Sequence, residues 1–356
     1  MGLRKLLASA LLLGGFALAG TGVVMGLDGP LATALDGSGA RKSAEPQAAE
    51  PVGTARVEAA WRSWMDRHGV TSSSLAIGRD GVILHSAGQK RSPQMAYPMA
   101  SLSKAVTGMC LNQLLKDGPY TWQSTVADLA PEFARMNFTP ADEMAGLTLE
   151  QIATHTSGLP EKLAYGKMST RSRNLSSQPT MAKAALKEAA NFGPRGSYVY
   201  SNSNYAILGF LIEAMSGKYY GDYCKEQIMV PAGADQATVA GRMSYAAGYG
   251  GWALSVEDYA RFAMHWFAPE QPWMTAPAQF AYDRSVHYGM GVHVLPAHPG
   301  TFVRHTGRWT HKDPRKPNIG ALFFVRPDGL TVVASWDGSL DWDLYNELFQ
   351  DLQDAV

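Results

Sequence analysis

Cysteine is scarce in this sequence. Cys110 and Cys224 are the two cysteines among 356 residues, and neither belongs to a C-x-x-C pair. The spacings typical of zinc sites and thioredoxin-type redox sites are therefore missing. We expect both residues to be buried thiols, because unpaired cysteine is among the most buried residue types. A single disulfide is the alternative, and the sequence does not give the Cα separation that would decide between the two.

An excess of charge of either sign is also missing, since 31 Lys and Arg residues balance 31 Asp and Glu residues. A nucleic-acid-binding protein normally has a basic face, and this chain has no run rich in lysine or arginine. The G-x-S-x-G, G-x-G-x-x-G and Walker A patterns do not occur, which argues against an α/β-hydrolase and against nucleotide binding. We therefore expect no nucleic-acid partner and no cofactor.

The first 27 residues have the pattern of an export signal. Arg4 and Lys5 precede a charge-free stretch, residues 6–27, that is rich in Leu, Ala and Gly. Ala17-Leu18-Ala19 offers a small-x-small cleavage site, so we predict a signal peptide. The stretch is just long enough to cross a bilayer, and an uncleaved signal anchor is the alternative. Either way we expect a periplasmic or secreted protein whose only membrane contact is this segment.

The rest of the chain divides into a linker and one domain. Residues 28–54 are Ala, Gly, Pro and Ser with scattered charge and no apolar period, which predicts a flexible tether. Residues 55–356 are predicted to form a single large domain, because hydrophobic residues make up 46% of the chain and provide material for a sizeable core.

Within this domain the periodicity predicts an α+β fold. Strands are expected near both ends of the domain, at 73–77, 82–86, 293–295, 301–304, 320–325 and 330–336. Helices are expected near residue 55, at 105–115, 149–154, 181–190, 205–215 and 255–267, and at the C-terminus through Leu344, Leu348 and Leu352. The prediction is an antiparallel sheet built from both chain ends and flanked by helices, with an all-α insertion at about 105–270.

Ser101-Leu102-Ser103-Lys104 lies where a loop gives way to a predicted helix. Residues i and i+3 share one face of a helix, so Lys104 can reach the Ser101 hydroxyl and take its proton. The positive end of the helix dipole also favours the serine alkoxide and the oxyanion that follows. Taken alone, the tetrapeptide is more typical of an N-cap serine followed by a solvated lysine.

Two further segments favour the catalytic interpretation. Tyr200-Ser201-Asn202 lies in a predicted loop, and His305-Thr306-Gly307 follows the strand-like run 301–304. A tyrosine can act as a base only if a nearby cation stabilises its phenolate, because its ordinary pKa is near 10. Lys104 is the expected cation, and Asn202 would hold both the lysine and the substrate.

In this order and spacing, the three segments resemble those of the serine β-lactamase and penicillin-binding-protein superfamily, in its class C type, which has Tyr-x-Asn as the second motif. The resemblance covers residues 55–349 and includes scaffold segments at 152–159 and 250–252. It implies a β-lactamase/transpeptidase-like fold with the site between the sheet and the helical insertion. It also implies an oxyanion hole formed by the backbone N–H groups of Ser101 and Arg308.

The resemblance assigns a role to each candidate residue. Ser101, Lys104 and Tyr200 are expected to be catalytic. The expected substrate-binding residues are Asn202, His305, Thr306, Gly307 and Arg308.

One position departs from the family pattern. Penicillin-processing members usually carry lysine where this chain has His305, and an ordinary histidine is mostly neutral at pH 7. Histidine here is more similar to the D-aminopeptidase and esterase-like branches, although Arg308 could restore a positive charge. If His305 binds a substrate carboxylate, the preference for carboxylate-bearing substrates should rise as the pH falls towards 6, because more of the histidine is then protonated.

Histidines also invite a metal interpretation. Five of the nine lie close together in sequence: His287, His293, His298, His305 and His311. None forms H-x-x-x-H or has an adjacent carboxylate at ligand spacing, so we predict no metal site. His155 belongs to the scaffold segment 152–159, and we leave it out of the catalytic set.

The sequence therefore predicts an exported serine hydrolase that forms an acyl-enzyme and cleaves esters or amides. D-amino-acid peptides and β-lactams are the candidate substrates, and the expected partner is a small molecule or a peptide. The alternative is a penicillin-recognising sensor or cell-wall binding protein that is acylated without turnover. A pseudo-enzyme is disfavoured because all three motif positions are filled.

Overall fold

The computed structural model describes residues 53–160, 177–187, 193–269, 280–283, 286–296, 300–311, 315, 317–338 and 341–356. The predicted signal segment and nearly all of the predicted linker lie outside this part of the chain. Among the described residues, no helix has both the length and the apolar character that crossing a membrane requires.

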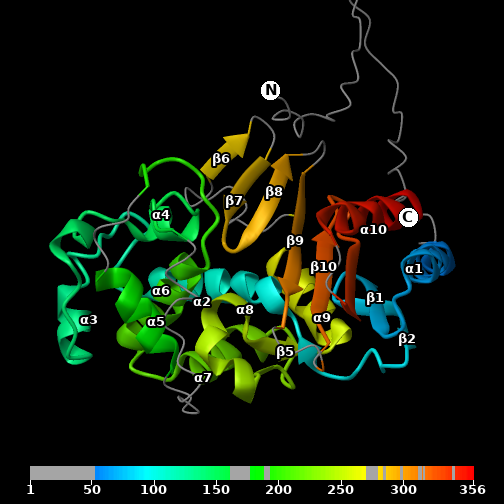
Figure 1. The fold of residues 1–356 in the computed structure, drawn as a ribbon, viewed down its shortest axis with the longest axis horizontal. Helices are drawn as coiled ribbons and strands as arrows, with labels where there is room; N and C mark the ends of the chain where they lie inside the picture. The colour runs from blue at the N-terminus through cyan, green and yellow to red at the C-terminus, as the bar shows by residue number, and fades with distance from the viewer. Residues whose placement is uncertain are drawn as a thin grey trace, which may run out of the picture. The chain divides into compact units, whose positions relative to one another are not determined.

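An antiparallel sheet of eight strands forms the framework (Figure 1). Its strand order is β2-β1-β11-β10-β9-β8-β7-β6, so the N-terminal hairpin pairs with the last strand of the chain. The strands are β1 (Ser73–Arg79), β2 (Val82–Gln89), β6 (Phe280–Asp283), β7 (Val286–Gly289), β8 (Val292–Pro296), β9 (Thr301–Trp309), β10 (Ile319–Val325) and β11 (Thr331–Asp337). The prediction of a sheet built from both chain ends is confirmed.

Both faces of the central strands are buried, because helices cover each side. Leu322 and Phe324 of β10 pack in one core with helices α1 (Thr54–His68) and α10 (Trp342–Asp354). Phe323, between them, points into the other core, which includes α9 (Val256–Trp266). Side chains alternate across a strand, so a continuous apolar run such as β10 fits a sheet covered on both sides.

Helices dominate the chain between β2 and β6. They are α2 (Ser103–Asp117), α3 (Ala130–Arg135), α4 (Leu149–Ala153), α5 (Ser177–Lys187), α6 (Asn202–Ser216), α7 (Tyr220–Cys224), α8 (Ala247–Gly250) and α9. Residues 202–214 of α6 are all buried, which places this helix at the centre of the block. The block also contains two short strands, β4 (Thr238–Val239) and β5 (Trp252–Leu254). Strand β5 pairs with β4 on one side and with β3 (Tyr97–Pro98) on the other, and the three form a small second sheet.

Several boundaries differ from the prediction. Helix α6 begins at Asn202 rather than near residue 205, because the Ser201 side chain caps it by accepting a hydrogen bond from the Ser203 N–H. Strand β9 continues to Trp309 and contains the third motif instead of preceding it. Strands β6 and β7 were not predicted, and residues 188–190 of the predicted helix 181–190 lie outside the described residues.

The expectation of two free thiols is wrong, because Cys110 and Cys224 form a disulfide with a Cα–Cα distance of 5.4 Å. The bond joins α2, which follows the candidate serine, to α7. The two residues are 114 positions apart in sequence. Their proximity results from the packing of α2 and α7, which local spacing in the sequence does not reveal.

We predict that replacing both cysteines by serine lowers the free energy of unfolding by about 2–5 kcal/mol. Closing a loop of more than 100 residues restricts the unfolded chain strongly, and losing a native disulfide typically has this effect. Urea unfolding of the variant and of the oxidised wild-type protein measures the difference. An unchanged transition would show that the bond adds no stability, and wild-type protein treated with reductant serves as the matched control.

Candidate active site

Ser101 lies in a single 3-10 turn, Ala100–Leu102, which leads directly into α2. Lys104 is therefore in the first turn of the helix and on the same face as Ser101. Its side chain is fully buried, whereas Ser101 is partly exposed and lines a cavity of about 820 Å³. The structure thus gives the serine access to a substrate and keeps the lysine out of bulk water.

The Lys104 ammonium is held by three acceptors. Its Nζ donates to Ser101 Oγ at 3.1 Å, to Asn202 Oδ1 at 2.7 Å and to the Tyr249 carbonyl oxygen at 2.9 Å. An ammonium has three N–H donors, so this set satisfies the buried cation and points one donor at the serine. Asn202 holds the lysine as the sequence predicted, and it can do so because it is the first residue of α6.

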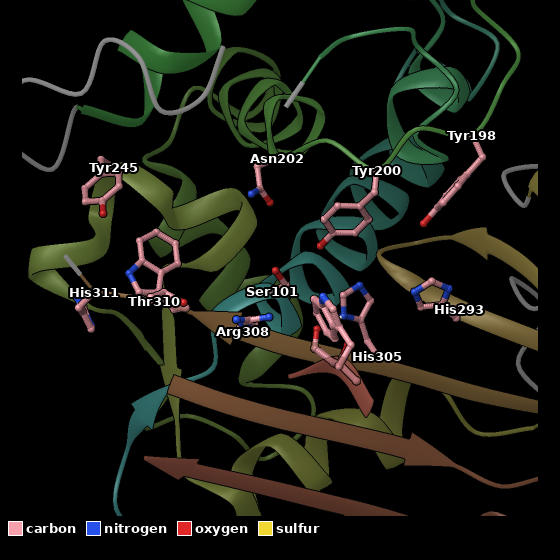
Figure 2. A pocket seen from close by; sticks show the side chains of 13 residues that line it. Ser101, Tyr198, Tyr200, Asn202, Tyr245, His293, His305, Arg308, Thr310 and His311 are labelled. Atoms are coloured by element: carbon pink, nitrogen blue, oxygen red, sulfur yellow. The ribbon is translucent and has the colours of Figure 1, made fainter. Parts of the chain in front are cut away.

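Tyr200 and Ser101 line the same cavity. The Lys104 Nζ lies 4.9 Å from the centre of the Tyr200 ring, so the cation is close to the phenol. In Figure 2 the Tyr200 hydroxyl points into the space in front of Ser101, with Asn202 beside it. The structure therefore brings together the three residues that the sequence predicted to be catalytic. Its geometry suits a serine whose proton passes to a lysine–tyrosine pair.

Strand β9 forms the opposite wall and carries the third motif. His305, Thr306 and Arg308 line the cavity with Ser101 (Figure 2). Gly307 is not among the residues that line the cavity, because it packs against the turn that carries Ser101. A Cβ atom added at Gly307 would lie 2.5 Å from the Met99 carbonyl oxygen, which no side chain permits. Glycine at this position is what lets β9 approach Ser101 closely, as an oxyanion hole shared by Ser101 and Arg308 requires.

His305 is a neutral, fully engaged side chain. Its Nδ1 lies 2.6 Å from the Thr306 carbonyl oxygen and must donate to it, while Nε2 lies 3.2 Å from the Tyr288 hydroxyl and can accept from it. Burial lowers the pKa of His305 well below its usual value, and the nearby charge of Lys104 lowers it further. The pKa of His293 is itself lowered to about 4, mainly by burial.

Because His305 is neutral, the preference for carboxylate-bearing substrates is not expected to rise towards pH 6 as the sequence suggested. An imidazole with a pKa of 6.5 goes from about 3% to about 75% protonated between pH 8 and pH 6. Because the pKa of His305 lies well below that value, its ring stays neutral over this range. We predict that the ratio of kcat/KM for a carboxylate-bearing ester to that for a matched neutral ester changes less than about twofold between pH 8 and pH 6. A several-fold rise centred near pH 6.5 would contradict this charge state.

The cavity wall contains residues that the sequence did not single out as substrate-binding. They are Tyr198, Tyr245, His293, Trp309, Thr310, His311 and Trp342. Trp309, Thr310 and His311 follow Arg308, the last residue predicted to bind substrate, and for them this proximity was the available signal. Trp342 and Tyr245 come from distant elements that only the fold brings to the site. Among the lining residues that the structure describes, Arg308 carries a charge and none is acidic.

His293 and His305 are the clustered histidines that lie side by side at the site, and His298 lies outside the described residues. His293 and His305 have ring centres 5.3 Å apart, but both pack among aromatic side chains. Within the described ranges, no group of three or more His, Cys, Asp or Glu side chains is placed to hold a metal ion.

Comparison with known sequences identifies the proteins that this chain is similar to. The sequence model of the family described as Beta-lactamase matches residues 57–337. Penicillin-binding protein 4* of Bacillus subtilis is 28% identical over 148 residues, which cover 41% of this chain and 31% of that protein. Protein flp of Staphylococcus aureus is 26% identical over 171 residues, or 46% of this chain and 33% of that protein. The chain thus spans about a third of the length of these relatives.

Solved structures show the same fold. The beta-lactamase/D-alanine carboxypeptidase from Yersinia pestis superposes with a TM-score of 0.68 at 16% identity, covering 85% of this chain and 98% of that one. The D-amino acid amidase from Ochrobactrum anthropi SV3 superposes with a TM-score of 0.64 at 18% identity, covering 84% and 98%. The family match extends from α1 to the end of β11 and includes all three motifs. The chain therefore belongs to the beta-lactamase family.

Proposed function

We propose that this protein is a serine hydrolase that works through an acyl-enzyme on Ser101. The observation that carries the proposal is the 3.1 Å hydrogen bond between Lys104 Nζ and Ser101 Oγ, at the wall of a cavity large enough for a small molecule. A buried lysine beside an accessible serine is one of the nucleophile–base arrangements by which a serine is activated.

The proposed reaction has two halves. In the reactive form Tyr200 is a phenolate that the Lys104 ammonium stabilises. Ser101 Oγ attacks the substrate carbonyl carbon, its proton passes to the Tyr200 phenolate, and the resulting phenol then protonates the leaving alcohol or amine. The backbone N–H groups of Ser101 and Arg308 would stabilise the oxyanion. Water then attacks the acyl-enzyme, the Tyr200 phenolate takes its proton, and Ser101 is regenerated as the acid leaves.

The cavity favours some substrates over others. A free ammonium group would find no carboxylate among the described lining residues, and His305 provides no positive charge. Trp309, Trp342 and Tyr245 provide an apolar wall, and Arg308 can bind a carboxylate. We therefore propose neutral esters or amides as the first substrates to test, with D-amino-acid peptides and β-lactams dependent on Arg308.

A substrate panel tests this proposal. It contains a chromogenic cephalosporin, short-chain nitrophenyl esters, D-amino-acid amides and a D-Ala-D-Ala peptide. Many product equivalents per protein would support a hydrolase. One equivalent would favour a slowly acylated sensor or cell-wall binding protein, an alternative that gains weight from the name of the relative Penicillin-binding protein 4*. Absence of both acylation and turnover across the panel would contradict both.

We further propose that the protein is exported. The pattern of residues 1–27 motivates this, and the Cys110–Cys224 disulfide supports it, because such bonds persist mainly in oxidising compartments. Cell fractionation with thiol labelling tests the proposal, and a cytoplasmic protein with reduced cysteines would contradict it.

A further inference from the structure

His155 lies directly behind the candidate catalytic residues and is not used by the proposed reaction. It follows α4 and is only 1% exposed. Its backbone has a φ of +60°, a conformation that residues other than glycine rarely adopt. A strained, buried histidine of this kind persists only where surrounding interactions hold it.

Those interactions bind the segment that carries Tyr200 on both sides of that residue. The His155 carbonyl oxygen accepts a hydrogen bond from the Val199 N–H at 2.8 Å. The His155 Nδ1 accepts from the Ser201 N–H at 3.2 Å. The His155 ring also packs on the Tyr200 ring, with 4.4 Å between ring centres. One residue thus fixes the backbone before and after the phenol and supports the ring itself.

The geometry also determines the protonation of His155. Its Nδ1 accepts from the Asn204 side-chain amide at 3.0 Å as well, so the ring proton must lie on Nε2. Nε2 is buried and has no hydrogen-bond partner among the described residues. A second proton would have to lie on Nδ1, where the Ser201 and Asn204 N–H groups already point. The rings of Tyr205 and Tyr288 lie 5.2 and 4.7 Å from the His155 ring, so a charged ring there would be buried among aromatic side chains.

We propose that His155 is a positioning residue: as a neutral acceptor it holds Tyr200 at the distance from Lys104 and Ser101 that proton transfer requires. It is not among the residues that line the cavity, so its effect on the reaction passes through Tyr200. A misplacement of about 1 Å at a reacting group can reduce a rate about 100-fold. The inference rests on the proposed hydrolase function.

The test compares two variants of similar shape. In His155→Asn the amide oxygen replaces Nδ1 as acceptor, and asparagine tolerates a positive φ. In His155→Leu the shape is similar but no acceptor remains. We predict that His155→Leu lowers kcat by about 10- to 100-fold with KM changed less than about threefold, and that His155→Asn keeps kcat within about fivefold of wild type. Steady-state kinetics on the best ester of the panel provides both parameters.

A double-mutant cycle separates positioning from general damage. In a Tyr200→Phe background, His155→Leu is expected to lower kcat by less than about threefold more, because the group that it positions is already absent. Tyr205→Phe is the matched control. It removes a buried hydroxyl that donates to the Ala153 carbonyl oxygen beside His155 but leaves residues 199–201 bonded. We expect it to lower the unfolding temperature and to leave kcat within about threefold.

Each outcome decides the inference. Additive losses in the two backgrounds, or wild-type kcat in a folded His155→Leu protein, would overturn it. If His155→Leu does not fold, His155→Gln replaces it in the test. The glutamine amide lies one carbon further from the backbone, so it does not place an acceptor at the position of Nδ1. Wild-type kcat in a folded His155→Gln protein would likewise overturn the inference. Wild-type protein that neither turns over an ester nor reacts with a fluorophosphonate would instead overturn the proposed function, and the inference with it.

Discussion

Replacing Ser101 by alanine is expected to lower kcat by at least 10⁴-fold and to abolish covalent labelling by a fluorophosphonate. In serine hydrolases with a concerted nucleophile and base, loss of the serine removes roughly six orders of magnitude, and the residual rate comes from binding and the oxyanion hole. Here Ser101 is the hydroxyl that combines exposure to the cavity with a bond to Lys104. Hydrolysis of the best ester of the panel measures the loss.

A neighbouring serine provides the control for this experiment. Ser103 is buried, and its Oγ accepts a hydrogen bond from the Trp252 N–H at 3.0 Å. Ser103→Ala should lower stability by about 1 kcal/mol, the typical effect of losing one buried hydrogen bond, and retain labelling. Substantial labelling or turnover in a folded Ser101→Ala protein would mean that another residue is the nucleophile.

Tyr200→Phe is expected to lower kcat by about 10²- to 10⁴-fold, the usual range for loss of a general acid or base. Phenylalanine keeps the ring that packs on His155 and removes the hydroxyl that faces Ser101, so the fold should be preserved. The expected loss falls on kcat rather than on KM, because the phenol acts on the moving proton and not on substrate binding. Steady-state kinetics and thermal unfolding of the same protein preparation measure both effects.

Tyr198→Phe is the comparison variant for the same cavity wall. Tyr198 and Tyr200 are both phenols that line the cavity. Lys104 Nζ lies 4.9 Å from the ring centre of Tyr200. We expect Tyr198→Phe to reduce kcat far less than Tyr200→Phe. Equal losses would assign the two phenols similar roles, and full activity of Tyr200→Phe would remove tyrosine from the proton transfer.

The sequence predicts most of this fold because its strongest patterns are local. The Asp-Gly turn at residues 80–81 and the continuous apolar run in β10 depend on short-range rules, and both are found where predicted. The end of β9 was missed because residues 305–309 are mostly polar on the cavity side, which hides their β alternation. The active-site face of a strand thus weakens the signal that would identify the strand.

The sequence predicted those contacts of the candidate site that are made between residues of the three motifs. Lys104 reaches Ser101 because residues i and i+3 share a helix face, and Asn202 reaches Lys104 as the second motif predicted. The lowered pKa of His305 was not predictable, since it depends mainly on burial, which follows from the packing of elements that are distant in sequence. The partnership of His155 with residues 199–201 was missed for the same reason: it joins two loops that only the packing of α4 against α6 brings together.

Trapping the acyl-enzyme is the most direct test of the central claim, that Ser101 carries the acyl group. The protein is mixed with an excess of its best ester, quenched in acid within the first turnovers, and analysed by intact mass and peptide mapping. We predict one acyl group per protein, located on the peptide that contains Ser101 and absent from the Ser101→Ala variant. An actively hydrolysing protein whose acyl group lies on another residue, or that never carries one, would contradict the account.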